Sequence, residues 1–245
     1  MRPRIGITSN VALNDRAVAH AHCYVNAAYV DAVFAAGGTP LVLPPPPTSD
    51  PDALDALLAA CDAVLFTGGA DLNPRHYGQT PHPATCALPD RRDRFEVEFF
   101  RRSERRGLPV LAICLGCQVA NVARGGSLVQ HIDELPRPSP VEHHRPDETS
   151  AFHDVAIVPD SLLARVVGAT RIEVNSRHHQ VVSADQLGGA LRPVAFAPDG
   201  VVEAAEDRAR PFMLAVQWHP EDLIDRPEHL RLFEALVDAA GRARR

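Results

Sequence analysis

The chain has 245 residues, and its 45% hydrophobic content is enough for one large globular domain or two small ones. Its 31 acidic and 25 basic residues give a formal net charge of -6, and the basic residues are scattered, which argues against nucleic-acid binding. The longest apolar runs are too short to span a membrane, and the N-terminal "MRPRIGIT" lacks the apolar segment of a secretion signal, so we expect a cytoplasmic protein.

Strands and helices alternate along the first half of the sequence. The patterns predict a strand at 4–8, a helix at 23–38, a strand at 39–45, a helix at 50–61, a strand at 63–69, a helix at 93–107, a strand at 108–113 and a helix after Cys114. Repeated alternation of this kind predicts a parallel sheet that is covered by helices on both faces.

The second half of the sequence is richer in strands. Strands are predicted at 153–159, 171–175, 180–184, 192–198, 201–206 and 212–218, followed by a helix at 227–240. The Pro- and His-rich segments 80–90 and 135–150 are predicted loops. Because no internal repeat or linker divides the sequence, we expect a single domain over residues 1–245.

The junction "LAICLGCQ" places a thiol where the most apolar strand meets a helix. A nucleophile on a tight turn from strand to helix needs small neighbours, and Ala112 and Gly116 flank Cys114. The N-terminus of the helix favours the thiolate, which is the attacking species. Two other interpretations stay open at this point: Cys114 is a buried core residue, or it forms a redox pair with Cys117. The five cysteines are odd in number and irregularly spaced, so no disulfide framework is expected.

The segment "LAVQWHPED" contains a matching base and carboxylate directly after an apolar strand. Pro220 favours an extended conformation at His219, and alternate residues of an extended segment point the same way, so Glu221 is expected beside the imidazole. A carboxylate in that position holds the tautomer of the ring and stabilises the imidazolium. Cys114, His219 and Glu221 are therefore predicted to act as nucleophile, base and orienting group.

The remaining histidines of the loops suggest no metal site. They are His143 and His144 of "HHRP", together with His76, His82, His131 and His153. None of them has the spacing of a known ligand motif, so we expect them in solvated loops, and we expect neither a metal nor another cofactor.

Several motifs together resemble a known family. They are "CLGCQ" (114–118), "VQWHPE" (216–221), "TGGADLNP" (67–74), "RRDRFE" (91–96), "ARGGSL" (123–128) and "NSRHHQ" (175–180). The first two are similar to the CxGxQ and HPE patterns of the class I glutamine amidotransferase superfamily. The whole set, in this order, resembles the gamma-glutamyl-gamma-aminobutyrate hydrolase family, peptidase family C26.

This resemblance implies a fold and a reaction. The fold would be a flavodoxin-like three-layer α/β/α arrangement with a mostly parallel central sheet and additional antiparallel strands in the C-terminal half. The reaction would be hydrolysis of a γ-glutamyl amide through a thioester on Cys114, with His219 as general base and acid and Glu221 as its orienting group. The expected partners are a small γ-glutamyl substrate and, as an option, a second copy of the chain in a homodimer.

The resemblance also implies a substrate pocket. Backbone N–H groups of Leu115 and of the turn Gly68–Gly69 would bind the oxyanion, and Gln118 would lie beside the substrate. Motif positions that would face the pocket are Asn175, Ser176, His178 and His179.

Two positions depart from the family pattern. Leu115 and Cys117 stand where the hydrolases usually carry Arg and Met, and in this respect the sequence is closer to glutaminase domains of synthetases. A glutaminase subunit that supplies ammonia to a synthase, and a catalytically silent binding protein on the same fold, therefore stay as alternatives to a γ-glutamyl hydrolase.

Overall fold

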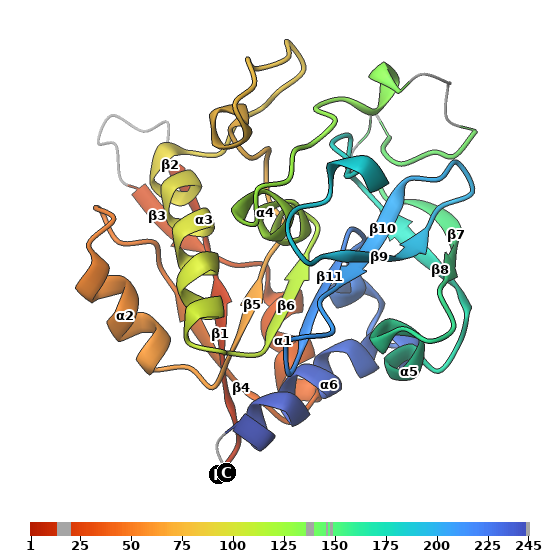
Figure 1. Ribbon diagram of the computed structural model, residues 1–245. Helices are drawn as coiled ribbons and strands as arrows, with labels where there is room; N and C mark the ends of the chain where they lie inside the picture. Colours follow the sequence, from red (N-terminus) through yellow and green to blue (C-terminus); the bar gives the residue numbers. More distant parts are fainter. Residues whose placement is uncertain (14–20, 136–139, 146, 148, 244–245) are drawn as a thin grey trace.

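A computed structural model describes residues 1–13, 21–135, 140–145, 147 and 149–243. Its main feature is a nine-stranded sheet with the order β4-β1-β5-β6-β11-β10-β9-β7-β8, which joins strands from both halves of the chain. The parallel strands are β1 (Arg4–Thr8), β4 (Thr39–Leu43), β5 (Ala63–Phe66), β6 (Val110–Ile113) and β11 (Met213–Val216). The antiparallel strands are β7 (Ala151–Ile157), β8 (Arg171–Ser176), β9 (Arg192–Phe196) and β10 (Val202–Glu206). Figure 1 shows the parallel part at the left and the antiparallel part at the right.

Helices cover both faces of the sheet because the strands of its centre are apolar on both faces. In β5, Ala63 and Leu65 belong to one core, and Val64 and Phe66 belong to the other. The first core packs against α1 (Ala27–Ala35), α5 (Leu162–Val167) and α6 (Pro227–Ala243). The second core packs against α2 (Pro51–Ala59), α3 (Asp90–Arg105) and α4 (Leu115–Ala123). The expected three-layer α/β/α architecture, with antiparallel strands added by the C-terminal half, is confirmed.

Capping residues explain where several helices begin. The Asn26 side chain accepts a hydrogen bond from the N–H of Ala28 at the start of α1. At the start of α2, the Asp50 side chain accepts one from the N–H of Asp52. Ser161 caps α5 in the same way, and Gly168 ends that helix in the left-handed conformation.

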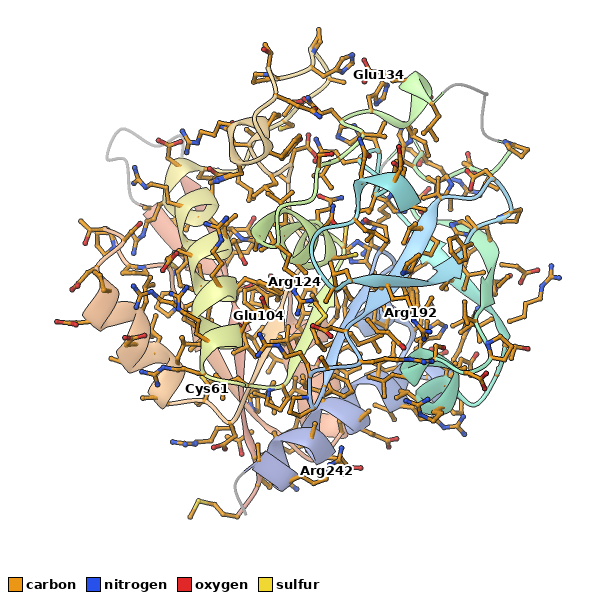
Figure 2. The ribbon with its side chains drawn as sticks, viewed as in Figure 1. Cys61, Glu104, Arg124, Glu134, Arg192 and Arg242 are labelled. Carbon is orange, nitrogen blue, oxygen red and sulfur yellow. The ribbon has the colours of Figure 1, made fainter. Side chains whose placement is uncertain are left out.

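Arg124, in the sequence motif "ARGGSL", forms ion pairs with residues of two other parts of the fold. Arg124, at the end of α4, contacts Glu104 of α3, and Figure 2 shows the two side chains close together. Arg124 also pairs with Asp207 after β10, at 2.8 Å. This arginine therefore has a structural role that connects two helices to the sheet.

Two local predictions are wrong, and one short helix was not predicted. Residues Ala21–Tyr24 form β3, which pairs antiparallel with β2 (Asn10–Leu13) in a second sheet, so the helix predicted from residue 23 begins only at Ala27. The short helix α5 was not predicted, because six residues are too few to show a helical period. The strand predicted at 180–184 is reduced to isolated bridges at Val181 and Val182.

Within the described residues, none of the helices has the length and apolar character that crossing a membrane requires.

Candidate active site

Cys114 occupies the turn between β6 and α4. Its φ of 53° and ψ of -105° make it the only non-glycine residue with a positive φ in the described part of the chain. A conformation of this kind costs about 1–3 kcal/mol and is found where function requires it. Gly116 makes the turn possible, since a Cβ at that position would lie 2.7 Å from the carbonyl oxygen of Phe66. The backbone therefore presents Cys114 at the C-terminal edge of the sheet.

The sheet brings the second motif to the same edge. Strands β6 and β11 are parallel neighbours, with Ile113 opposite Val216, so the residues that follow each strand emerge side by side. The N–H of Cys114 extends this pairing by donating to the carbonyl of Val216 at 2.8 Å. His219, three residues beyond Val216, thus lies close to the thiol.

Glu221 holds the ring of His219. The distance from His219 Nδ1 to Glu221 Oε1 is 2.6 Å, and the carboxylate is buried. The expected pairing is therefore present, but its expected cause is wrong: Glu221 lies in a 3-10 turn (Pro220–Leu223), not in an extended segment. Asn175 adds a second support, because its side chain accepts from the N–H of His219 at 2.9 Å and donates to the His219 carbonyl at 3.0 Å.

The charges of the site favour a protonated His219. Burial alone would lower the pKa of this imidazole, but the negative charges of Glu221 and Cys114 outweigh it and raise the pKa to about 10. The ring is therefore an imidazolium at neutral pH, and it can donate a proton from the nitrogen that faces the thiol. Burial and the nearby Glu221 also raise the pKa of Tyr29, so its hydroxyl stays neutral.

A cavity of about 570 Å³ opens at these groups. Its lining residues are Asn26, Gly69, Cys114, His144, Arg145, Thr149, Arg177, His179 and His219. Cys114 is 5% exposed and His219 is 7% exposed, so a small molecule in the cavity reaches both side chains. Cys114 also belongs to the hydrophobic core on this face of the sheet, so it is both a packed residue and part of the cavity wall.

The glycine turn after β5 supplies one side of an oxyanion site. The N–H of Gly68 is already bonded, at 2.9 Å, to the hydroxyl oxygen of Tyr29, which corrects the expectation that it binds an oxyanion. The N–H groups of Gly69 and Leu115 have no acceptor among the described residues. Gly68 serves a different purpose, since a Cβ there would lie 2.8 Å from Cε1 of His219.

Only one of the four residues predicted from "NSRHHQ" lines the cavity. His179 lies in the wall, where its Nε2 is 3.0 Å from an oxygen of Asp71. Asn175 supports His219 from behind, and Ser176 donates to the carbonyl of His143. His178 is buried and turned toward Glu203. The prediction that Asn175, Ser176 and His178 face the pocket is therefore wrong.

Gln118 also lies outside the cavity lining. Its amide donates to the carbonyl of Gln180 at 3.3 Å, so it ties α4 to the segment after β8. Burial raises the pKa of Cys117 far above its usual range, which leaves this thiol un-ionised and argues against a redox pair with Cys114.

Residues from distant segments complete the site, and local sequence patterns did not show that they lie there. The guanidinium of Arg92, in "RRDRFE", is fully buried and donates to the carbonyl of Gly68 and the hydroxyl of Thr67, both at 2.9 Å. Glu96, one helical turn later, balances its charge at 2.8 Å. The i, i+4 spacing of Arg92 and Glu96 was a signal for this ion pair. No local pattern indicated that Arg177 lines the cavity.

The expectation of solvated histidines is wrong for two of them. His143 is 2% exposed and His153 lies within β7, and both rings face Glu203 of β10. His143, His153 and Glu203 lie close enough together to hold a metal ion, and so do His219, Glu221 and Asp222. In the second group the side chains already have partners: Glu221 contacts His219, and Asp222 pairs with Arg177 at 2.6 Å.

Comparisons with known proteins agree with this arrangement. The sequence model of the family described as Peptidase C26 matches residues 3–221. A Mycobacterium tuberculosis protein named "Putative glutamine amidotransferase" is 42% identical over 218 residues, which cover 89% of this chain and 68% of that protein. The gamma-glutamyl-gamma-aminobutyrate hydrolase of Escherichia coli K12 is 33% identical over 227 residues, covering 89% of this chain and 85% of the relative.

Solved structures support the fold. The glutaminase domain of a Trypanosoma brucei protein, solved with bound acivicin, superposes with a TM-score of 0.67 at 18% identity, and the match covers 98% of this chain and 94% of that one. The fold is thus that of the class I glutamine amidotransferases. The chain belongs to the peptidase C26 family within this class, and its relatives mark it as a hydrolase of the amidase and glutamine amidotransferase-like kind.

Proposed function

We propose that the protein hydrolyses the γ-glutamyl amide bond of a γ-glutamyl amine, such as γ-glutamyl-γ-aminobutyrate, and releases glutamate and the amine. The observation that carries the proposal is that Cys114, His219 and the unpaired N–H of Gly69 all meet at one cavity. A nucleophile, a proton donor and an oxyanion donor around one cavity are what acyl transfer requires.

The first half of the reaction forms a thioester. The sulfur of Cys114, as the thiolate that pairs with the imidazolium of His219, attacks the carbonyl carbon of the amide. The carbonyl oxygen takes up the negative charge and accepts hydrogen bonds from the N–H groups of Gly69 and Leu115. His219 then gives its proton to the amine nitrogen, the C–N bond breaks and the amine leaves.

The second half releases glutamate. His219, now neutral and held by Glu221, takes a proton from water, and the water oxygen attacks the thioester carbon. The C–S bond breaks with the electrons returning to sulfur, so the thiolate and the imidazolium are restored.

The cavity wall suits a substrate with carboxylate groups. Arg145, Arg177, His144 and His179 line the cavity and offer donors for such groups. A cavity of about 570 Å³ matches the size of a small ligand. These features support an acidic γ-glutamyl compound over an uncharged or polycationic one.

A glutaminase subunit is the second candidate. The observation in its favour is the 42% identical relative, whose name is that of a glutamine amidotransferase. In that case glutamine is the substrate, and a synthase partner receives the ammonia.

One experiment separates these functions. The purified protein and its Cys114→Ala variant are incubated with γ-glutamyl-γ-aminobutyrate, with other γ-glutamyl amines and with glutamine, and free glutamate is measured. Glutamate from γ-glutamyl amines, but little from glutamine, supports the hydrolase. Glutamine turnover that appears only with a synthase partner supports the subunit, and no turnover of any of these compounds points to the silent binding protein.

A further inference from the structure

Three histidines and a glutamate converge away from the catalytic cavity. We call His143, His153, His178 and Glu203 the His3Glu cluster. Relative to Oε1 of Glu203, His143 Nδ1 lies at 3.4 Å, and Nε2 of His153 and Nε2 of His178 each lie at 3.6 Å. The facing atoms of His143, His153 and Glu203 are all within 4.8 Å of one another. The four side chains are between 0% and 6% exposed.

These separations are longer than those of ordinary hydrogen bonds. All three ring nitrogens, and both oxygens of Glu203, are buried without a hydrogen-bond partner in the described structure. Leaving one such group unpaired costs about 1–3 kcal/mol, and five such atoms belong to this cluster. A species bound between these side chains would satisfy them.

The outer nitrogen of each ring lies near an oxygen atom. His143 Nε2 lies 2.8 Å from Asp199, and the Nδ1 atoms of His178 and His153 lie 3.1 Å and 3.3 Å from backbone carbonyls. When each outer nitrogen carries the hydrogen of a neutral ring, the inner nitrogen has a lone pair that can bind a metal ion. In that state the three inner nitrogens and the carboxylate of Glu203 are all acceptors, and a cation between them would satisfy all four.

We propose that the His3Glu cluster is a binding site for one Zn²⁺ ion. Zinc bonds of 2.0–2.1 Å in tetrahedral geometry place neighbouring ligand atoms about 3.3–3.4 Å apart. The three histidine nitrogens lie 3.4–3.6 Å from Oε1 of Glu203, and only His143, His153 and Glu203 have ligand atoms within 4.8 Å of one another among the described residues of the cluster, so zinc would draw His178 closer to the other two rings. Imidazole and carboxylate ligands suit zinc, and a carboxylate or carbonyl behind each histidine is the usual support of a zinc ligand.

The site is structural in character. Glu203 fills the fourth position, and the burial of all four side chains leaves no opening for a substrate. Two of the ligands adjoin the catalytic cavity: His144, which follows His143, lines it, as do the residues on either side of His178. Zinc at this position would fix that wall of the cavity.

The test is metal analysis of the full-length, untagged protein. The protein is stripped with a chelator, reconstituted with Zn²⁺, desalted and measured by elemental mass spectrometry, and the same is done with Co²⁺. We expect about one zinc per chain and, with cobalt, the intense visible absorption of a tetrahedral site. A reconstituted wild-type protein without zinc above the buffer level, or a cobalt complex without that absorption, overturns the proposal.

Variants locate the metal. Glu203→Ala and His178→Ala should lose the zinc, whereas His82→Ala, a loop histidine outside the cluster, should keep it. Asp199→Asn leaves every ligand in place and tests the proposal even if the first two variants do not fold, because loss of a supporting carboxylate lowers zinc affinity about 10–100-fold. Unchanged zinc affinity in the Asp199 variant, or full zinc content in the folded ligand variants, contradicts the site. Cys114→Ala should keep its zinc, so this result is independent of the proposed hydrolase activity.

Discussion

Two histidine–carboxylate groups lie in the C-terminal half of the chain, and they differ in distance and in access. At the catalytic site, His219 and Glu221 are 2.6 Å apart and the other side of the ring faces a cavity. In the His3Glu cluster, the rings stay 3.4–3.6 Å from the carboxylate and the group is closed to solvent. A short contact with one open side suits proton transfer, whereas longer contacts on all sides suit a metal ion. Similar residue types thus serve different chemistry because the backbone sets their separation.

The largest effect expected is on catalysis alone. Cys114→Ala should lower the rate of glutamate release by about 10⁴-fold or more, because the attacking sulfur is absent. Zinc content and the unfolding transition should stay close to those of the wild type. Rate measurements with γ-glutamyl substrates, together with metal analysis, check both points. If Cys114→Ala retains most of its activity, Cys114 is not the nucleophile.

The second effect acts on the cluster alone. Zinc that binds only the folded state, at 1,000 times its Kd, adds about 4 kcal/mol to the free energy of unfolding. For a chain of this size, chelation should therefore lower Tm by about 8–16 °C, and added zinc should restore it. Differential scanning calorimetry of the wild type and of Glu203→Ala measures this. The sharpest contradiction would be a Tm that a chelator leaves unchanged in the wild type.

The third effect concerns the carboxylate behind the catalytic histidine. Glu221→Gln should lower kcat about 100-fold, because the amide no longer stabilises the imidazolium. The pKa of His219, about 10 in the wild type, should also fall, so the alkaline limb of the kcat/KM profile moves to lower pH. Glu98→Gln serves as the matched control, since it alters a partly exposed carboxylate of α3 outside both the cavity and the His3Glu cluster. An alkaline limb that does not move in the Glu221 variant would contradict the assignment.

The same pairing makes stability depend on pH. The pKa of His219 is raised in the folded state, so its stabilising contribution is complete below the unfolded value, about 6.5, and is lost as the pH rises toward about 10. Urea unfolding at several pH values should show the free energy of unfolding falling over this window in the wild type. The slope should be smaller in Glu221→Gln.

The smallest effect tests the strained turn. Glycine adopts a positive φ readily, so Cys114→Gly should be about 1 kcal/mol more stable than Cys114→Ala, which corresponds to about 2–4 °C in Tm. Both variants lack the sulfur, which makes them a matched pair for thermal unfolding. Equal stability would show that the φ of 53° carries no strain.

The sequence predicted the catalytic group better than its surroundings. The apolar run before Cys114 and the one before His219 identified two strands, and each chemical group follows its strand within a few residues. The cavity wall was harder to predict because Arg145 and Arg177 reach it from separate loops, and no spacing in the sequence reports that approach. Gln118 and Ser176 were placed at the pocket by resemblance, while their side chains make hydrogen bonds elsewhere.

By itself, the sequence determined the alternation of strands and helices, the turn that presents Cys114, and the pairing of His219 with Glu221, because all of these depend on residues near one another in the chain. The tertiary structure alone decided that β6 and β11 are neighbours, which brings thiol and imidazole together. It also decided the His3Glu cluster, whose members come from a loop, two different strands and the end of a third. Contacts between such distant segments arise from sheet pairing and burial, which local sequence patterns do not encode.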